Sequence, residues 1–384
     1  MKINKTPYYS YKVGKLAKGC QLCVKGEKLV LFITGLCPRC CYFCPISDQK
    51  YQKDVIFADE WPTKNIKDII QEAKLISAKG AGITGGDPLC KLSRTLSAII
   101  SLKKQFTKKF HIHLYTSLDL INKPTLQKLY NSGLDEIRFH LDLKDHNLWP
   151  KLKLALNYNW DVGIEIPAVP KHEGDIKKII LNINELNKNK TQIKFLNLNE
   201  LEVADNKVNK LIELGYKTKD EYSYAIKGSE VLALKLFTFI ERNKLKVNTH
   251  YCTAKLKDKV QLANRIKHRA KNIKRPYDKL TSEGTLIRGA IYLDKPSFGY
   301  RNNLAKILFN KKLRSNYLLR LNKIKNKIIK QYHISNELIE IDKSKLRILI
   351  KPSILRKIKE PYVKAIVEEY PTWDLLELNI EFLI

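Results

Sequence analysis

Four cysteines lie within eight residues of the stretch that reads LCPRCCYFCP, residues 36–45. Cys37, Cys41 and Cys44 follow the spacing C-x3-C-x2-C, and Cys40 falls outside it. Three thiolates in one short loop can hold three irons of a [4Fe–4S] cluster and leave the fourth iron open to a substrate or cofactor. Zinc is the alternative, because Cys37 with Cys40 and Cys41 with Cys44 also form C-x2-C pairs. The loop therefore predicts a metal centre.

The elements around this loop are expected to form a parallel α/β fold. Apolar runs typical of strands cover residues 28–35, 81–84, 111–117, 136–143, 161–169 and 192–199, and a seventh run covers 245–249. Helical patterns fill gaps at 65–78, 92–104, 123–132 and 176–186. Such alternation predicts βαβ units in a partial (β/α)6 barrel, where chemistry sits at the C-terminal ends of strands. Structural zinc rarely occupies the loop after the first strand of such a fold, which favours iron.

A second motif, Gly85-Gly86-Asp87-Pro88, follows the second expected strand. With the cysteine motif and Phe43, this turn resembles the radical S-adenosylmethionine (SAM) enzymes, and most closely the group related to pyruvate formate-lyase activating enzymes. The resemblance covers roughly residues 28–205. It implies that Cys37, Cys41 and Cys44 hold a [4Fe–4S] cluster, that Phe43 lies beside the adenine of SAM, and that the turn binds the methionine amino group. The family has Glu where Asp87 stands, so this carboxylate is one methylene shorter.

The resemblance also implies contacts between SAM and the ends of later strands. A polar residue on the third or fourth strand of the family binds the methionine carboxylate or the ribose, and the candidates here are Ser117 and Asp142 first, then Thr116 and His140. The fifth strand carries positions that pack on adenine, which match Gly163 and Ile166. Asn197 and Asn199 point to one face of the sixth strand, where they either reach the ligand or cap the strand end.

Cys20 and Cys23 form a further C-x2-C pair before the first strand. We expect residues 24–28, which read VKGEK, to form a hairpin turn that puts this pair on the order of 20 Å from Cys37, at about 3.3 Å per residue. The pair predicts either a second metal site, holding zinc or an auxiliary cluster, or buried idle thiols. Partners for a second metal would be sought among Cys252, His250, Cys40 and Cys90.

Composition predicts four parts along the chain, namely an N-terminal extension (1–27), a radical SAM partial barrel (28–253), a basic helical segment (254–330) and a small α/β unit (331–384). In the basic segment, amphipathic helical patterns cover residues 255–279 and 301–330. The second of these stretches carries no acidic residue. In the last part we expect strands over 345–350 and 375–383 and a helix over 353–367.

The formal net charge is +32, from 71 Lys and Arg against 39 Asp and Glu. Such a charge indicates a polyanionic partner such as RNA, or merely the Lys-rich codon usage of an AT-rich genome. The preferred hypothesis is a radical SAM enzyme that cleaves SAM to a 5′-deoxyadenosyl radical and activates a C–H bond in tRNA or another RNA. One alternative is an activase that forms a glycyl radical on a partner protein. Another is a non-catalytic zinc-cysteine protein that binds RNA.

The length of the apolar runs, the N-terminal residues and the number of cysteines predict the compartment of the protein and, with it, the kind of electron donor. No apolar run reaches 18 residues, so no membrane span is expected, and the N-terminus lacks the apolar core of a signal peptide. Eight cysteines without a secretory signal favour metal binding over disulfides. We therefore expect a cytoplasmic enzyme that receives electrons from a donor such as ferredoxin or flavodoxin.

Overall fold

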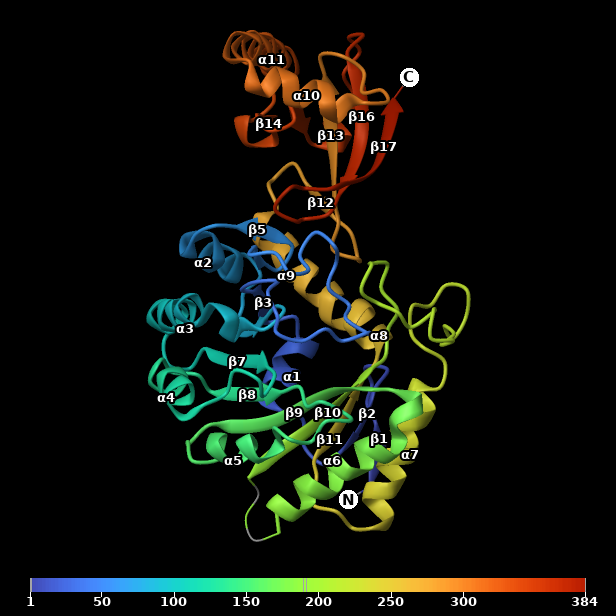
Figure 1. The fold of residues 1–384 in the computed structure, drawn as a ribbon. Helices are drawn as coiled ribbons and strands as arrows, with labels where there is room; N and C mark the ends of the chain where they lie inside the picture. Colours follow the sequence, from blue (N-terminus) through green and yellow to red (C-terminus); the bar gives the residue numbers. More distant parts are fainter. Residues whose placement is uncertain (1, 189, 191, 384) are drawn as a thin grey trace. The chain divides into compact units, whose positions relative to one another are not determined.

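The structure is a computed structural model that describes residues 2–188, 190 and 192–383. These residues form two units, Met1–Arg265 and Ile266–Ile384 (Figure 1). The boundary falls within helix α9 (Ala263–Ile273).

An eleven-stranded sheet organises the described part of unit 1, in the order β1-β2-β11-β10-β9-β8-β7-β6-β3-β4-β5. Its central strands run parallel to one another: β3 (Lys28–Phe32), β6 (Gly80–Thr84), β7 (His111–Thr116), β8 (Glu136–Phe139), β9 (Asp161–Ala168), β10 (Ile193–Glu200) and β11 (Thr249–Cys252). Antiparallel strands flank them, namely β1 (Ile3–Lys5) and β2 (Tyr11–Val13) on one side and β4 (Ile56–Ala58) and β5 (Trp61–Thr63) on the other. The sheet is therefore open, and the predicted partial barrel is confirmed.

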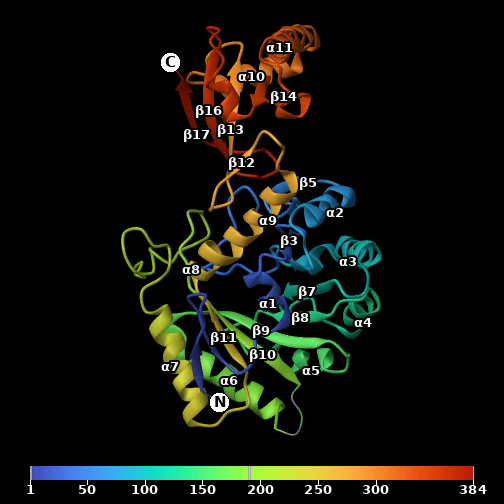
Figure 2. The ribbon, with the colours of Figure 1, turned by 180° about the vertical axis from the view of Figure 1, so that it is seen from behind.

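Helices alternate with the parallel strands and cover the outside of the curved sheet (Figures 1 and 2). They are α2 (Ile66–Leu75), α3 (Leu92–Phe106), α4 (Lys123–Asn131), α5 (Leu152–Ala155), α6 (Glu173–Leu186) and α7 (Ser229–Arg242). Asn65 and Asn122 begin α2 and α4 by accepting hydrogen bonds from the backbone N–H groups of Asp68 and Thr125, as N-cap residues do. The sequence patterns predicted α2, α3, α4 and α6, whereas α5 and α7 were not predicted.

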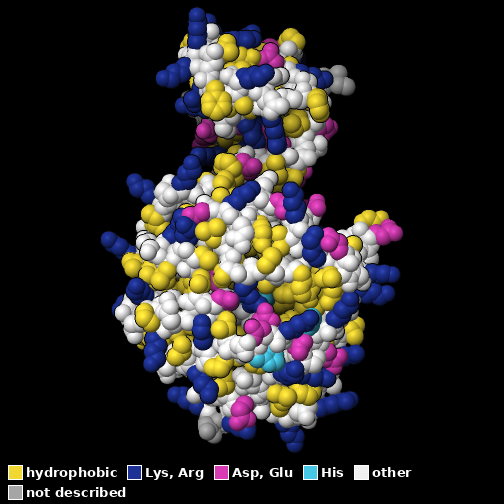
Figure 3. All heavy atoms as spheres, viewed as in Figure 1, with side chains coloured by type: hydrophobic (Ala, Val, Ile, Leu, Met, Phe, Trp, Pro, Cys, Tyr) yellow, Lys and Arg dark blue, Asp and Glu magenta, His cyan; other side chains and the backbone are white. Residues whose placement is uncertain are grey.

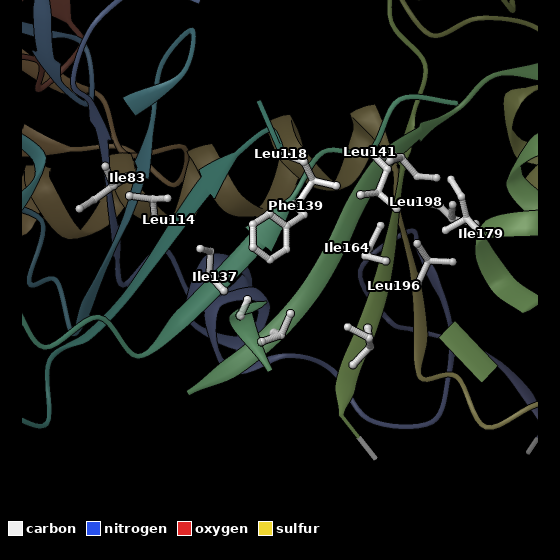
Figure 4. Packing of buried hydrophobic residues seen from close by; sticks show 14 of the residues in the cluster. Ile83, Leu114, Leu118, Ile137, Phe139, Leu141, Ile164, Ile179, Leu196 and Leu198 are labelled. Atoms are coloured by element: carbon white, nitrogen blue, oxygen red, sulfur yellow. The ribbon is translucent and has the colours of Figure 1, made fainter. Parts of the chain in front are cut away.

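The main core lies between the sheet and these helices. Figure 4 shows strand residues such as Phe139, Ile164 and Leu198 packed with one another, and with Ile179 of α6 nearby. Side chains alternate between the two faces of a strand, so the residues between these point to the concave interior, among them Arg138, Glu165 and Asn197. The concave face of these strands is therefore polar, whereas their outer face is apolar.

The N-terminal pair of cysteines is not on a hairpin, and that prediction is wrong. Cys20 and Cys23 lie on helix α1 (Lys18–Val24), which lies in the concave interior, where Gly19 comes close to two sheet residues. A Cβ on Gly19 would lie 2.5 Å from His113 Nδ1 and 2.6 Å from Arg138 Nη2. The helix can approach the interior so closely because this position carries no side chain.

Unit 2 is built on an antiparallel sheet with the strand order β14-β15-β13-β16-β17, to which β12 adds beside β13. The strands are β12 (Lys279–Leu280), β13 (Leu286–Tyr292), β14 (Ile339–Asp342), β15 (Arg347–Ile350), β16 (Val363–Glu369) and β17 (Glu377–Leu383). The helices are α10 (Tyr300–Phe309), α11 (Lys311–Tyr332) and α12 (Pro352–Leu355), and the short α8 (Ala254–Leu256) belongs to unit 1.

The helix expected over 353–367 is wrong, because α12 ends at Leu355 and β16 begins at Val363. Pro361 stands between them, and proline interrupts a helix. Val363, Ala365 and Val367 alternate along β16, which is paired on both sides, with β13 and with β17. Residues 363–367 are therefore a strand, despite their helix-like apolar spacing, because β16 pairs with β13 and β17.

Candidate functional site

The cysteine loop follows β3 and is paired at its base with the glycine turn that follows β6. The N–H of Gly86 donates to the carbonyl of Thr34 at 2.8 Å, and the N–H of Asp87 donates to the carbonyl of Leu36 at 2.8 Å. Gly85 has a φ of +152°, and a Cβ there would lie 2.3 Å from the Thr34 oxygen. A Cβ on Gly86 would lie 2.4 Å from the Leu36 oxygen. Both glycines are therefore required for close contact between the two loops.

We expect Gly86→Ala to displace the cysteine loop, because the new methyl group meets a backbone carbonyl that cannot turn away. The free energy of unfolding should fall by about 1–3 kcal/mol, which lowers the unfolding midpoint. SAM binding should weaken as well. Gly174→Ala is the matched control, since nothing lies within 4 Å of a Cβ in this position of α6. Thermal unfolding and SAM titration of both variants check this, and equal behaviour of the two would contradict it.

The four thiols of the loop differ in their surroundings. Cys40 is exposed and its Sγ lies 3.5 Å from the hydroxyl of Tyr51, whereas Cys37, Cys41 and Cys44 are partly buried. Burial raises the pKa of Cys37 to about 12 and also raises the pKa values of Cys41 and Cys44. None of the four is in a disulfide, so the three partly buried thiols are free to become metal ligands.

Within the described residues, no group of three or more His, Cys, Asp or Glu side chains is already gathered around a point where a metal ion would sit. The three thiols nevertheless lie near one another, since Cys41 acts electrostatically on Cys37 and Cys44 acts on Cys41, and Cys40 acts on Cys41 and Cys44 as well. In number, spacing and chemistry they fit three corners of an iron–sulfur cluster.

A segment that follows β10 holds the cysteine loop from another side. The side-chain amide of Asn206 donates to the carbonyls of Cys44 and Ile46 at 3.0 and 2.9 Å, and the N–H of Lys210 donates to the carbonyl of Tyr42 at 2.7 Å. This support could not be predicted from the sequence, because these residues lie some 160 positions after the loop.

Arg39, inside the cysteine spacing, ties the loop to the end of β8. Its guanidinium donates to the carbonyl of His140 at 3.0 Å and forms an ion pair with Asp142 at 2.5 Å. Burial would raise the pKa of Asp142, but hydrogen bonds from the backbone of Asp145 and Lys144 and the charge of Arg39 outweigh it and lower the pKa. Asp142, expected as a SAM contact, is thus an ionised partner of the cysteine loop.

A cavity of about 370 Å³ opens beside this ion pair. Its walls carry residues of the cysteine loop, of the segment after β8 and of the turn after β9: Arg39, Cys40, Cys41, Tyr42, Phe43, Leu141, Asp142, Leu143, Lys144 and His172. Phe43 lies between Tyr42 and His140, with ring centroids 4.9 and 5.9 Å away. The structure therefore brings Phe43, Asp142 and Cys41 to one cavity, together with Lys144 and His172, which the sequence did not single out.

Asp87 and Ser117 lie together and are hydrogen-bonded to each other. The buried Asp87 carboxylate accepts hydrogen bonds from Ser117 Oγ, Ser117 N, Thr116 Oγ1 and Leu89 N, at 2.8 to 3.1 Å. Burial raises its pKa, and these hydrogen bonds counter the rise. The carboxylate has no free lone pair directed outward, so it braces the glycine turn against β7.

Gly163 and Ile166 are not brought to the cavity. A Cβ on Gly163 would lie 2.1 Å from the ring of Phe195, which fills the space over that residue. Ile166 is fully buried in the core between sheet and helices, on the opposite face of β9 from Glu165. The expectation that these two residues pack on adenine does not agree with their positions.

The concave interior instead holds a polar network centred on Glu165. Arg138 Nη1 lies 2.8 Å from the Glu165 carboxylate, and Asn197 and Asn199 donate to it at 2.9 and 3.0 Å. Burial would raise the pKa of Glu165, but Arg138 and the two amides outweigh it and lower the pKa. The shared face of Asn197 and Asn199 agrees with the expectation, whereas their hydrogen bonds to Glu165 were not expected. The buried ion pair was missed because Arg138 and Glu165 lie in otherwise apolar strands.

Cys20 joins this network, since Asn197 Nδ2 lies 3.1 Å and Arg138 Nη1 lies 3.6 Å from its Sγ. Cys23 and Cys252 both bond to the side-chain amide of Gln261, at 3.3 and 3.6 Å. The thiols expected to form a second metal site thus have protein partners.

Two histidines, the buried His250 and the half-buried His140, predict acid sensitivity. Burial lowers the pKa values of His140 and His250 to about 4, and the charge of Arg39 adds to the effect on His140. In the unfolded chain both titrate near 6.5, so between pH 6.5 and 4 the unfolded state binds protons that the folded state does not. Stability should therefore fall as pH falls through this window, by up to about 1.4 kcal/mol per pH unit for each histidine.

Urea unfolding at a series of pH values checks this expectation. His250→Gln should remove one group from the titration and make the dependence less steep, although it also changes the contact with Ser10 Oγ at 3.3 Å. An unchanged slope in this variant would contradict a neutral, buried His250.

Comparison with known proteins decides the family. Residues 31–162, which include the cysteine loop and the glycine turn, match the radical SAM superfamily. A protein of Methanocaldococcus jannaschii, provisionally named a glycyl-radical enzyme activating enzyme, is 43% identical over 297 residues, which cover 75% of this chain and 76% of the relative. The chain belongs to the radical SAM superfamily. This radical SAM protein is accordingly an iron–sulfur enzyme, as the family implies.

Solved structures resemble it only remotely. A radical SAM methyltransferase of Kitasatospora setae aligns with a TM-score of 0.37 at 9% identity, over 68% of this chain and 55% of that chain. The coproporphyrinogen III oxidase of Escherichia coli aligns with a TM-score of 0.36 at 13% identity, over 60% and 57%. Among the described residues, no helix combines the length and apolarity that a membrane span requires.

Proposed function

We propose that Cys37, Cys41 and Cys44 hold the [4Fe–4S] cluster of this radical SAM enzyme and that SAM binds in the cavity beside Phe43. The observation that carries this proposal is the shared base of the cysteine loop and the glycine turn, which fixes the loop that bears the three partly buried thiols and keeps Cys41 in the wall of the cavity. When bound and reduced, the cluster supplies the electron that converts SAM to methionine and a 5′-deoxyadenosyl radical. The chain itself positions SAM and substrate and excludes water from the radical.

Specific groups support the binding of SAM. Phe43 offers an aromatic face in the cavity, and Lys144 offers a cation in the same wall, suited to the methionine carboxylate. The carboxylate of Asp87 is occupied by its own hydrogen bonds, so the backbone carbonyls of the turn remain as acceptors for the amino group. Ser117 then acts by fixing Asp87.

The hydrogen atom is proposed to come from a glycyl residue of a partner protein. Support comes from the relative of Methanocaldococcus jannaschii, whose name describes an activating enzyme of this kind. Nothing in the comparisons favours RNA modification or a second metal, and Cys20, Cys23 and Cys252 have protein partners in the interior. A donor such as ferredoxin or flavodoxin is proposed as the source of the electron.

Activation of candidate partner proteins in vitro tests the choice of substrate. The protein and each candidate glycyl-radical enzyme of the same organism are mixed anaerobically with SAM and a reductant, and the partner is examined by electron paramagnetic resonance. We expect a glycine-centred signal with doublet splitting that depends on SAM. SAM cleavage without any such signal, or a genome with no such partner, would contradict the glycyl substrate while leaving the radical chemistry intact.

A further inference from the structure

Helix α11 of unit 2 carries a straight row of cations on its outer face. Five exposed residues form this row, which we call the α11 row: Lys312, Arg320, Lys323, Lys327 and Lys330. Their spacings of eight, three, four and three residues keep them on one side of a helix. At 1.5 Å per residue the row extends for about 27 Å. Lys and Arg side chains project from this part of unit 2 in Figure 3.

The opposite side of α11 is fixed to unit 2. Leu321 and Ile328 are buried in a core with strand residues such as Ile348 and Ile350. The helix therefore cannot roll to hide the row, and the cations keep their spacing in solution.

No cation of the row forms an ion pair within the described part of the chain, and the charge of Lys327 acts on one carboxylate outside the helix, Glu360, and helps to lower its pKa. Residues 300–332 contain no Asp or Glu, and among the described ion pairs only Arg301 of this stretch takes part, 3.9 Å from Glu377. Inside the same unit, by contrast, the buried Arg288 and Arg347 each meet the Glu369 carboxylate. Like charges at i,i+3 and i,i+4 destabilise a free helix, so a bound polyanion would relieve a repulsion that the fold leaves in place.

From this geometry we propose that unit 2 binds the phosphate backbone of a nucleic acid along the α11 row. Backbone phosphates form a long, regular line of negative charge, which Lys, Arg and Asn side chains commonly contact. Asn316 lies between Lys312 and Arg320 on the same face. An acidic protein surface fits less well, because protein interfaces depend on aromatic anchors and are poor in Lys, and the exposed apolar side chains that α11 carries beside the row are two leucines, Leu313 and Leu319, and no aromatic residue. This inference is independent of the substrate proposed above.

The test compares two variants of the full chain with equal changes of charge. Arg320→Glu/Lys323→Glu/Lys327→Glu reverses three cations of the row, and Lys343→Glu/Lys351→Glu/Arg356→Glu reverses three exposed cations outside α11 in unit 2. Binding of fluorescent unfractionated tRNA is measured by anisotropy at several salt concentrations. We expect the row variant to raise Kd at least tenfold and to reduce the slope of log K against log salt by about three, at about 0.9 per phosphate contact. The control should stay within about twofold of the wild type.

Competition identifies the ligand. Release of the tRNA by duplex DNA as well as by unlabelled tRNA would support recognition of the backbone alone, and release by unlabelled tRNA only would support RNA as the source. Equal competition by poly-L-glutamate would overturn the inference in favour of an acidic protein, and so would equal weakening in both variants, or no binding at physiological salt. The same measurement on Cys41→Ala should match the wild type, so that loss of radical chemistry and failure of this inference are distinguished.

Discussion

Cys41→Ala is expected to abolish SAM cleavage, whereas Cys40→Ala leaves most of it. Both residues line the cavity, but Cys41 is partly buried and belongs to the C-x3-C-x2-C set, whereas Cys40 is exposed and hydrogen-bonded to Tyr51. Changes to groups that merely support a metal ligand commonly cost 10–100-fold, so the loss of a ligand should lower the rate by more than about a hundredfold. The two cysteines are adjacent, which makes each variant a close control for the other.

Iron content and SAM cleavage are measured together on anaerobically reconstituted protein. Cys41→Ala should lose iron, colour and product formation, and Cys40→Ala should keep all three. An equal loss in both variants would mean that the cluster uses Cys40, and the assignment by spacing would be wrong.

Arg138→Leu is expected to cause the largest loss of stability. Arg138 is 2% exposed, and its guanidinium lies 2.5 Å from Glu136 and 2.8 Å from Glu165. Removing it leaves two carboxylates in the interior without their cation, and such a change commonly costs about 3–5 kcal/mol. Urea unfolding at neutral pH measures the loss.

Lys210→Ala serves as the control for that experiment. Its ion pair with Glu213 is exposed, with 45% and 67% of the two side chains accessible, and exposed pairs contribute at most about 1 kcal/mol. A comparable loss in the two variants would show that Arg138 is not shielded from water as its burial indicates.

Local patterns were sufficient to predict the parallel half of the fold. The parallel strands β3, β6, β7, β8, β9 and β10 fall in apolar runs bounded by turn residues, and α2, α3, α4 and α6 have periodic apolar faces, so short windows contain the information. The short antiparallel strands β4 and β5 were not predicted. The helix expected over 353–367 failed because β16 depends on pairing with β13, whose residues 286–292 lie far away in the sequence. Helix α1 was missed for a similar reason, since its environment is the concave interior of the sheet.

The site, like the fold, could be predicted only where its residues are close together in the sequence. The residue types and spacing of the cysteine loop and the glycine turn were readable because both motifs are contiguous. The bonding of Asp87 to Ser117, the support of the loop by Asn206 and the link from Arg39 to Asp142 depend on contacts 30 to 162 residues apart. Gly163 and Ile166 were chosen by resemblance, and the ring of Phe195 and the alternation of β9 place them elsewhere.

The central claim is that the cysteine loop holds a cluster that cleaves SAM, and one measurement tests it most directly. The protein is reconstituted anaerobically with iron and sulfide, reduced, and incubated with SAM, and the products are separated by chromatography. We predict about four irons per chain, as in a [4Fe–4S] cluster, and 5′-deoxyadenosine and methionine in equal amounts. A protein that binds zinc alone and leaves SAM intact would contradict the claim.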